Sequence, residues 1–220
     1  MKQAMESNSS IAWFKLAELV KRGERERALS VLRLLSHSIT DKAFVALLEA
    51  ELFYLLRDER AKEACTRAIG LYQKEGRFDK VFLSYGTIFH WWPNDLGLVA
   101  ECATQCHGIE EESVWRTGAR LVIERYSAEH AWDALQCFVV SFQEEAARYI
   151  WLKKICVSQL ALRCDEHGQP PFVFEYCKEV AHFYLFDASL EESRNLTAFL
   201  TCLASSSQVL YEFLRREIEN

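Results

Sequence analysis

The sequence predicts an all-α protein, built as a right-handed α-solenoid with a C-terminal helical cap. Half of the 220 residues are hydrophobic and only 3 Pro and 8 Gly occur, which favours long helices joined by short turns. Apolar residues recur at helical spacing along most of the chain. In addition, Ala-Glu-Leu at 17–19 and Glu-Arg-Ala at 26–28 both return 33 residues later, at 50–52 and 59–61. Repetition at such a period indicates stacked helical repeats.

Large apolar, small and glycine positions follow a fixed order in the first copy: Trp13, Leu16, Ala17, Val20, Gly23, Ala28 and Leu32. In this order they resemble the tetratricopeptide (TPR) repeat, a family of stacked helix pairs. A second copy keeps Ala50, Phe53, Ala61, Ala68 and Ile69 but has Ala46, Glu49 and Leu56 in place of Trp, Leu and Gly. Weaker copies run through Gly86, Phe89 and Ala100, and through Trp115, Ala119, Val122, Ala131 and Leu135. The resemblance covers about residues 10–143 and implies about four helix pairs.

Helices are expected in this order: about 10–22, 25–37, 42–56, 59–74, 78–92, 95–107, 110–125, 127–142, 144–163, 172–186, 189–204 and 208–218. The expected start signals are Ser10, Ser127 and the capping-box spacing of Ser189 with Glu192. The expected stop signals are Gly23, Gly76, Pro93, Gly108 and the serines at 205–207. Each helix therefore begins or ends where a local signal allows it.

The expected organisation has three parts. Residues 1–9 are a polar, disordered leader, and residues 10–143 hold the TPR-like repeats. Periodicity loosens after that, so residues 144–220 are expected to form a degenerate repeat and capping helices. The most loop-like segment is 165–171, and it does not divide the chain convincingly into two domains.

Charge and apolar runs exclude several classes of protein. The net charge is −6, with 26 basic and 32 acidic residues, and Lys21-Arg22 and Lys153-Lys154 are isolated pairs. Nucleic-acid binding needs a basic stripe, so none is expected. No apolar run reaches 18 residues and the polar start lacks a secretory signal, so we expect no membrane span and a cytoplasmic location. Eight scattered Cys fit reduced thiols rather than a disulfide framework.

Few residues suggest catalysis or metal binding. Cys102, Cys106 and His107 could offer metal ligands, but a structural zinc site needs four ligands in paired short spacings. No second ligand pair lies nearby in the sequence, and choosing Cys164 and His167 as that pair would be arbitrary. No nucleophile elbow, phosphate loop or metalloprotease helix occurs. We therefore expect no catalytic residue, no metal and no cofactor. The enzyme alternative would use a Cys or His between residues 164 and 182.

A binding groove follows from the resemblance. In TPR-like proteins the first helix of each pair lines a concave groove, and the matching positions here are Phe14, Glu18, Lys21, Arg22, Leu47, Glu51, Tyr54, Leu55, Leu83, Thr87, His90, Trp91, Arg116, Arg120, Ile123 and Glu124. These positions hold no Asn, so a clamp for a terminal carboxylate is not expected. Trp91-Trp92-Pro93 ends a helix and could either fill the core or anchor a partner.

The expected function is a non-enzymatic adaptor or scaffold that binds a peptide or amphipathic helix of another protein in this groove. Aromatic residues make up 13% of the chain. This content leaves an alternative, a structural subunit or secretion-type chaperone whose apolar surface is buried in a homo- or hetero-oligomer.

Overall fold

The computed structural model describes residues 2–161, 170–188 and 190–219, with side chains from 12–161, 170–188 and 195–218. These residues form twelve α-helices and one short π-helix, and they contain no strand. The all-α prediction is therefore confirmed for the described part of the chain. Helix packing divides the chain into an N-terminal unit, residues 1–93, and a C-terminal unit, residues 94–220. This division does not coincide with the boundary expected at residue 143.

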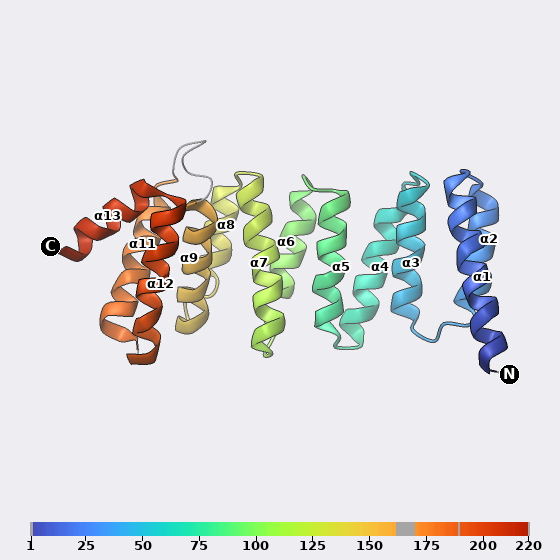
Figure 1. The fold of residues 1–220 in the computed structure, drawn as a ribbon, viewed down its shortest axis with the longest axis horizontal. Helices are drawn as coiled ribbons and strands as arrows, with labels where there is room; N and C mark the ends of the chain where they lie inside the picture. Colours follow the sequence, from blue (N-terminus) through green and yellow to red (C-terminus); the bar gives the residue numbers. More distant parts are fainter. Residues whose placement is uncertain (1, 162–169, 189, 220) are drawn as a thin grey trace. The chain divides into compact units, whose positions relative to one another are not determined.

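Five helices make up the N-terminal unit: α1 Lys2–Lys21, α2 Arg25–Ser36, α3 Lys42–Leu55, α4 Arg60–Lys74 and α5 Phe78–Trp91. Along this unit α1 packs on α2, α3 on α4, and α4 on α5 (Figure 1). Its first core consists of leucines from α1 and α2, Ala28 of α2 and Leu52 of α3. Alanines fill the α3–α4 contact, where Ala50 and Ala68 are completely buried, so the two helices can approach closely.

Three of the helices in the N-terminal unit, α1, α3 and α4, end with a residue in the left-handed conformation. Gly23 closes α1 with φ +72°, and Arg57 closes α3 with φ +54°. The next backbone N–H then donates to the carbonyl five residues earlier, from Glu24 to Leu19 at 2.9 Å and from Asp58 to Phe53 at 2.8 Å. This is the Schellman arrangement that satisfies the last carbonyls of a helix. The 33-residue match had placed Leu56 opposite Gly23; the structure has Arg57 there, because α3 continues one residue further.

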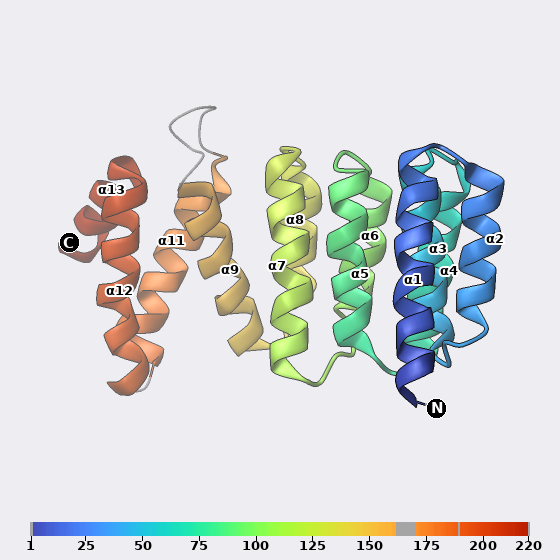
Figure 2. The same ribbon diagram turned by 45° about the vertical axis from the view of Figure 1, so that its right-hand side comes forward.

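The C-terminal unit contains α6 Leu96–Gln105, α7 Glu112–Ala128, α8 Trp132–Val140, α9 Ala146–Ala161, α11 Phe172–His182, the π-helix η1 Phe183–Asp187, α12 Leu190–Ser206 and α13 Gln208–Glu219. Within it α7 packs on α6, α8 and α9, while α11 packs on α9, η1 and α13 (Figure 2). Trp115 is the largest completely buried side chain among the described residues of this unit. The helix expected over 172–186 changes to π geometry after His182, a change that often accompanies functional sites.

Several start and stop signals are correct and others are not. Helix α5 ends before Pro93, α4 ends before Gly76, and α12 and α13 meet at Ser207. In contrast, α1 begins at Lys2, so the expected leader is helical and Ser10 lies inside the helix. Ser127 also lies inside α7, where it is buried. The expected capping position Ser189 lies outside the described residues.

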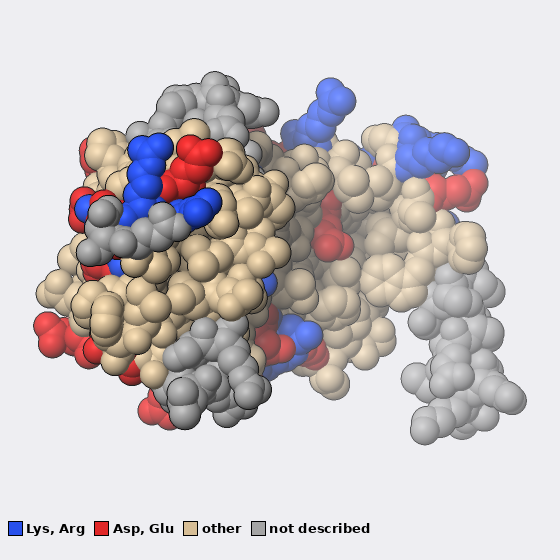
Figure 3. Space-filling view, turned by 60° about the vertical axis from the view of Figure 1, so that its left-hand side comes forward, with Lys and Arg blue, Asp and Glu red and all other residues tan. Residues whose placement is uncertain are grey.

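Two features of the structure concern the expected absence of a basic stripe and of a membrane span: the distribution of surface charge and the composition of the helices. On the face in Figure 3, charged side chains of the described residues form small groups of mixed sign separated by uncharged areas. None of the described helices combines the length and apolar character needed to cross a membrane.

Candidate functional site

An apolar cavity of about 370 Å³ lies between α1 and α3 in the N-terminal unit. It is lined by Trp13, Leu16, Ala17, Val20 and Lys21 of α1, Leu32 of α2, and Leu48, Glu51, Leu52 and Leu55 of α3. Residues three and four positions apart share one face of a helix, so each helix presents one continuous stripe to the cavity. The arrangement is a groove with helical walls, of a size that admits one or two large side chains or a small ligand.

The small residues of the repeat pattern differ in their roles. Ala28 is completely buried against α1, as expected of a residue that lets two helices approach. Ala17 occupies a small position of the same pattern, but it is exposed and lines the cavity. A methyl group at this position leaves space that a larger side chain would fill. Ala17 therefore helps to create the opening rather than to close the contact.

Two charged residues lie on opposite walls of the cavity. Lys21 is exposed on α1 and has no hydrogen-bond or ion-pair partner among the described residues. Glu51 lies on α3, and the removal of water by its neighbours raises the pKa of this carboxyl. The apolar groove thus has one cationic and one anionic group with which to orient a ligand.

An aromatic cluster continues the α3 wall. The rings of Tyr54 and Trp91 stack with their centroids 4.5 Å apart and an interplanar angle of 11°. Trp92 meets both rings edge-on, at 5.9 Å from Tyr54 and 5.7 Å from Trp91. Both tryptophans are half-buried, so each ring packs partly against the protein and is partly accessible to solvent. Rings held in this way form a rigid surface that can pack against apolar groups at little entropic cost.

A second hollow, of about 630 Å³, adjoins this cluster. Tyr54, Leu55 and Trp92 form its apolar side, and the first residues around α4 form its polar side, including Asp58 and Lys62. Leu55 also lines the α1–α3 cavity. The two hollows therefore share one wall, and together they form a strip along α3 that we call the α3 groove.

The expected groove residues fall into three groups. Lys21, Glu51, Tyr54 and Leu55 line the α3 groove. The others of the N-terminal unit lie on α1, α3 and α5 or directly after α1, and they are exposed or half-buried: Phe14, Glu18, Arg22, Leu47, Leu83, Thr87, His90 and Trp91. The remaining four, Arg116, Arg120, Ile123 and Glu124, lie on α7 in the other unit.

The prediction for Ile123 is wrong. Its side chain is completely buried in the C-terminal unit, where a surface ligand has no access to it. It lies four residues after Ala119, which is also completely buried, so both share the face of α7 that packs on the neighbouring helices. Arg116, Arg120 and Glu124 are exposed, so their part in binding stays a prediction.

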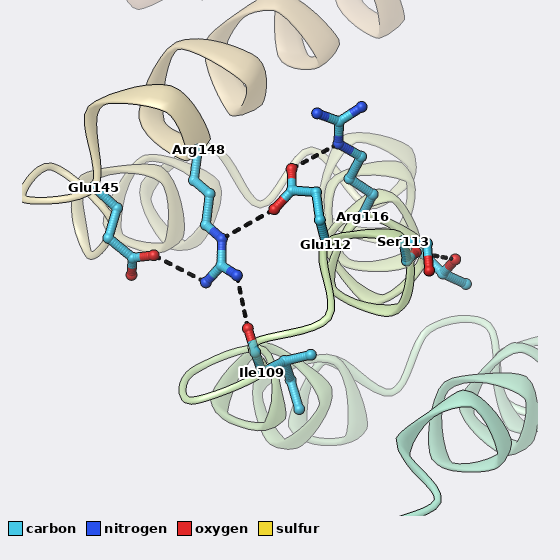
Figure 4. A network of polar contacts seen from close by, with 7 residues as sticks. Ile109, Glu112, Ser113, Arg116, Glu145 and Arg148 are labelled. Atoms are coloured by element: carbon cyan, nitrogen blue, oxygen red, sulfur yellow. Dashed lines mark hydrogen bonds and ion pairs between the residues drawn. The ribbon is translucent and has the colours of Figure 1, made fainter.

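Arg116 and Arg120 also have partners inside the C-terminal unit. Their guanidinium carbons lie 5.4 and 5.7 Å from the centre of the Trp151 ring. Arg116 bonds to Glu112 at 2.7 Å, and Glu112 reaches Arg148 at 3.3 Å (Figure 4). These arginines therefore form part of a network within the unit.

Arg148 is the centre of that network. Its guanidinium donates to the Ile109 carbonyl at 2.7 Å and to Glu145 at 2.9 Å, in addition to Glu112. It also covers the ring of Trp115 at 4.7 Å. A side chain with so many partners joins the start of α7 to α9, which is a structural role rather than a ligand site.

The apolar lining of the α1–α3 cavity was not predicted. Trp13 and Val20 of α1 and Leu48 of α3 fit the helical periodicity of a core, and periodicity alone does not distinguish a packed stripe from the lining of a cavity. The small residue Ala17 within the α1 stripe was the available signal.

The structure also shows the positions of the cysteines and the histidine that were considered as metal ligands. Cys102 and Cys106 are completely buried, and burial raises the pKa of Cys102 well above its usual value and that of Cys106 to about 12. His107 stacks on Phe142 with ring centroids 4.6 Å apart. Within the described part of the chain, no three His, Cys, Asp or Glu residues gather as a metal site would require. Cys164 and His167 lie outside the described residues.

No protein-family model, no curated protein and no solved structure matches this chain.

Proposed function

We propose that the protein is a non-enzymatic adaptor or scaffold, with TPR-like helix pairs arranged as a right-handed solenoid and closed by C-terminal helices. It holds an amphipathic helix or extended segment of a partner protein in the α3 groove. The observation that carries the proposal is the coincidence of this groove with four residues, Lys21, Glu51, Tyr54 and Leu55, that the repeat register assigns to partner binding.

Regular contacts between successive helix pairs support the repeat architecture. Arg25 forms an ion pair with Asp58, 33 residues further along the chain. Asp41 and Arg77, which lie 36 residues apart and directly precede α3 and α5, are joined at 2.7 Å. In the C-terminal unit, Glu112 and Arg148 are also 36 residues apart. Contacts across 33 and 36 residues, about the length of one helix pair, are what nearest-neighbour stacking produces.

The chemistry of the groove supports a protein partner. Leucine and tryptophan side chains surround the cavity, and Tyr54 with Trp92 supplies aromatic surface beside it. Aromatic residues are enriched at protein interfaces, and anchors in such hollows contribute most of the binding energy. Lys21 and Glu51 would fix the direction of a bound segment through groups of opposite charge.

The state of three buried thiols supports a function that does not use them as nucleophiles. Burial raises the pKa of Cys65 and of Cys106 to about 12, and it also raises the pKa of Cys156. A catalytic thiol needs a lowered pKa and access to substrate. These three have neither.

The test compares two substitutions of exposed leucines. Leu55→Asp places a charge in the α3 groove, whereas Leu34→Asp places the same charge on α2 outside it; their side chains are 63% and 73% exposed. Both variants should retain helical circular dichroism. A partner captured from native cell lysate by wild type and Leu34→Asp, but not by Leu55→Asp, is the expected result. Equal capture by all three would place the binding site elsewhere.

Exposed apolar side chains also support the second candidate, a permanently associated subunit. Phe14 and Leu83 are 80% and 60% exposed, and large apolar patches often mark interfaces. Light scattering distinguishes the two cases. A mass of 25.6 kDa at high concentration supports the adaptor, and a stable multiple of it supports the subunit.

A further inference from the structure

The C-terminal unit contains a larger cavity, of about 680 Å³. Helix α11 and η1 form its floor, and α9 and α13 form two walls. Its apolar lining includes Tyr149 and Ile150 of α9, Phe183 and Phe186 of η1, and Leu214 and Ile218 of α13. We call this hollow the α9–α13 groove. It is independent of the α3 groove, and no residue is shared between them.

The rim of this groove exposes large apolar side chains. Phe186 is 72% exposed, Leu185 44% and Ile218 37%. A small ligand is usually enclosed by its site, which buries most of the ligand's surface. Here the apolar surface extends outward beyond the cavity, so a small ligand would leave much of it in water. The occupant that covers the rim has to be larger, such as a segment of a protein.

Local contacts hold the exposed ring of Phe186 in place. It lies on the His182 ring, with centroids 4.7 Å apart, and Nδ1 of His182 lies 3.5 Å from the Asp187 carboxylate. Both contacts span the π-helix, a geometry that is frequent at functional sites. A side chain that is exposed and already positioned loses little freedom when a partner binds.

Carboxylates predominate among the charged groups of the lining. Glu179, Asp187 and Glu217 line the groove, with Lys178 as the one lysine among its described lining residues. Lys178 is paired with Glu217 at 3.2 Å. Glu179 is paired with the buried Lys153, and Asp187 lies beside the ring of His182. The three carboxylates exceed the two lysines by one negative charge, which favours a cationic neighbour.

A buried lysine lies behind one of these carboxylates. Lys153 is completely buried and is paired with Glu179, and its ammonium lies 3.7 Å from the centre of the Tyr149 ring. A ligand in the groove meets Glu179, whose side chain is 49% exposed, and not the lysine. The interior charge thus fixes the carboxylate without presenting a cation to the groove.

The dimensions match a docked helix. The floor runs from Lys178 to Asp187, roughly 14 Å at the rise of an α-helix, which is two to three turns. Helix α12 also packs on α9, η1 and α13, but none of its described residues lines the groove. Apolar residues at i, i+3, i+4 and i+7 of an amphipathic helix occupy grooves of this kind.

We propose that the α9–α13 groove is a docking site for an amphipathic helix of a partner protein, with large apolar side chains on one face and Lys or Arg beside them. The apolar face would cover Phe186 and Ile218, and the basic residues would lie next to Glu179, Asp187 and Glu217.

The test uses a display library of helical peptides of about 16 residues, selected on the full chain. Apolar residues are varied at i, i+3, i+4 and i+7, and the flanking positions are varied among Lys, Arg, Glu and Ser. We expect enrichment of basic flanks and binding of the selected peptide in fluorescence anisotropy. Phe186→Ser should weaken that binding about tenfold or more, as the loss of a central apolar anchor does. Asp187→Lys should weaken it by about threefold or more through charge.

Two control variants make the result decisive. Val209 lies on α13 outside the groove and is 52% exposed, so Val209→Ser should leave the affinity unchanged. Leu55→Asp, in the α3 groove, should also leave it unchanged. No enriched peptide, enrichment of acidic flanks, or equal binding to Phe186→Ser would overturn the proposal. So would a concentration-dependent dimer that Phe186→Ser abolishes, because the occupant would then be a second copy of this chain.

Discussion

Asp58 joins the starts of α2 and α4, and its replacement measures how strongly this contact holds the two helices together. Its carboxylate accepts from the backbone N–H of Arg60 at 3.0 Å and from the Arg60 guanidinium at 2.7 Å, and it also pairs with Arg25 at the start of α2. The side chain of Asp58 is 5% exposed, whereas those of Arg25 and Arg60 are about half exposed. Asp58→Ala therefore removes three contacts and leaves both arginines in water.

The contacts give the expected magnitude. An acceptor for a free N–H in the first turn of a helix contributes about 1 kcal/mol, and each half-exposed ion pair contributes about 0.5 kcal/mol. Asp58→Ala should lower the free energy of unfolding by about 2 kcal/mol. Asp58→Asn should lower it by only about 1 kcal/mol, because the amide oxygen can still accept from the backbone. The control is Asp79→Ala, an exposed carboxylate 3.8 Å from Lys80, whose loss should change stability little.

The pH dependence gives a second measure of the same junction. Hydrogen bonds from the Arg60 side chain and then from its backbone, with the charge of Arg25, lower the pKa of Asp58 from 3.8 to about 2. Since the folded state favours the charged carboxylate, its contribution is present above 3.8 and is lost as the pH falls towards 2. The difference between wild type and Asp58→Ala should therefore be smaller at about pH 3 than at about pH 6.

Urea titration followed by circular dichroism measures both effects. If Asp58→Ala and Asp79→Ala have the same free energy of unfolding, Asp58 does not stabilise the contact between the starts of α2 and α4. A difference that does not depend on pH would show that the carboxylate's charge contributes nothing to it.

Other positions give further predictions. Gly23→Ala should destabilise the protein by about 1 kcal/mol, since a Cβ there meets no atom within 4 Å and only the φ of +72° is strained. Arg57→Gly should stabilise it by about 0.5 kcal/mol, because a non-glycine residue has φ +54° there. If urea titration shows that Gly23→Ala stabilises the protein or that Arg57→Gly destabilises it, this explanation is wrong. Thiol labelling read by mass spectrometry should modify the exposed Cys137 and Cys202 quickly and the buried Cys156 only after unfolding. Rapid labelling of Cys156 in the native protein would contradict the packing described here.

Local signals in the sequence predicted the helices because they act through the backbone alone. Pro93 removes a donor, and Gly76 adopts φ +69° after α4, so each ends a helix whatever packs nearby. Ser127 failed as a start signal because the tertiary packing of α7 overrides it, and its hydroxyl is buried inside that helix. Serine is favoured at an N-cap but can also be accommodated within a helix.

The candidate site could be predicted only in part. Repeat register placed Lys21, Glu51, Tyr54 and Leu55 on one strip, because register determines which face of a helix a residue occupies. It failed at Ile123, where the neighbouring helices cover the face. The cavities were not predictable in this way, since they depend on the spaces left between helices.

The arrangement of the N-terminal unit suggests why its groove lies beside α1. Helix α1 packs on α2, while α2 packs only lightly on α3, so the first helix pair is attached to the next through a small surface. The Arg25–Asp58 pair is one of the links across it. A small contact between the two helix pairs leaves space between α1 and α3, and this space is the apolar hollow. On the neighbouring surface, the stacked rings of Tyr54 and Trp91 hold each other in place. The proposed α3 groove therefore combines an open apolar hollow with a preformed aromatic surface, and both features are typical of anchor positions at protein interfaces.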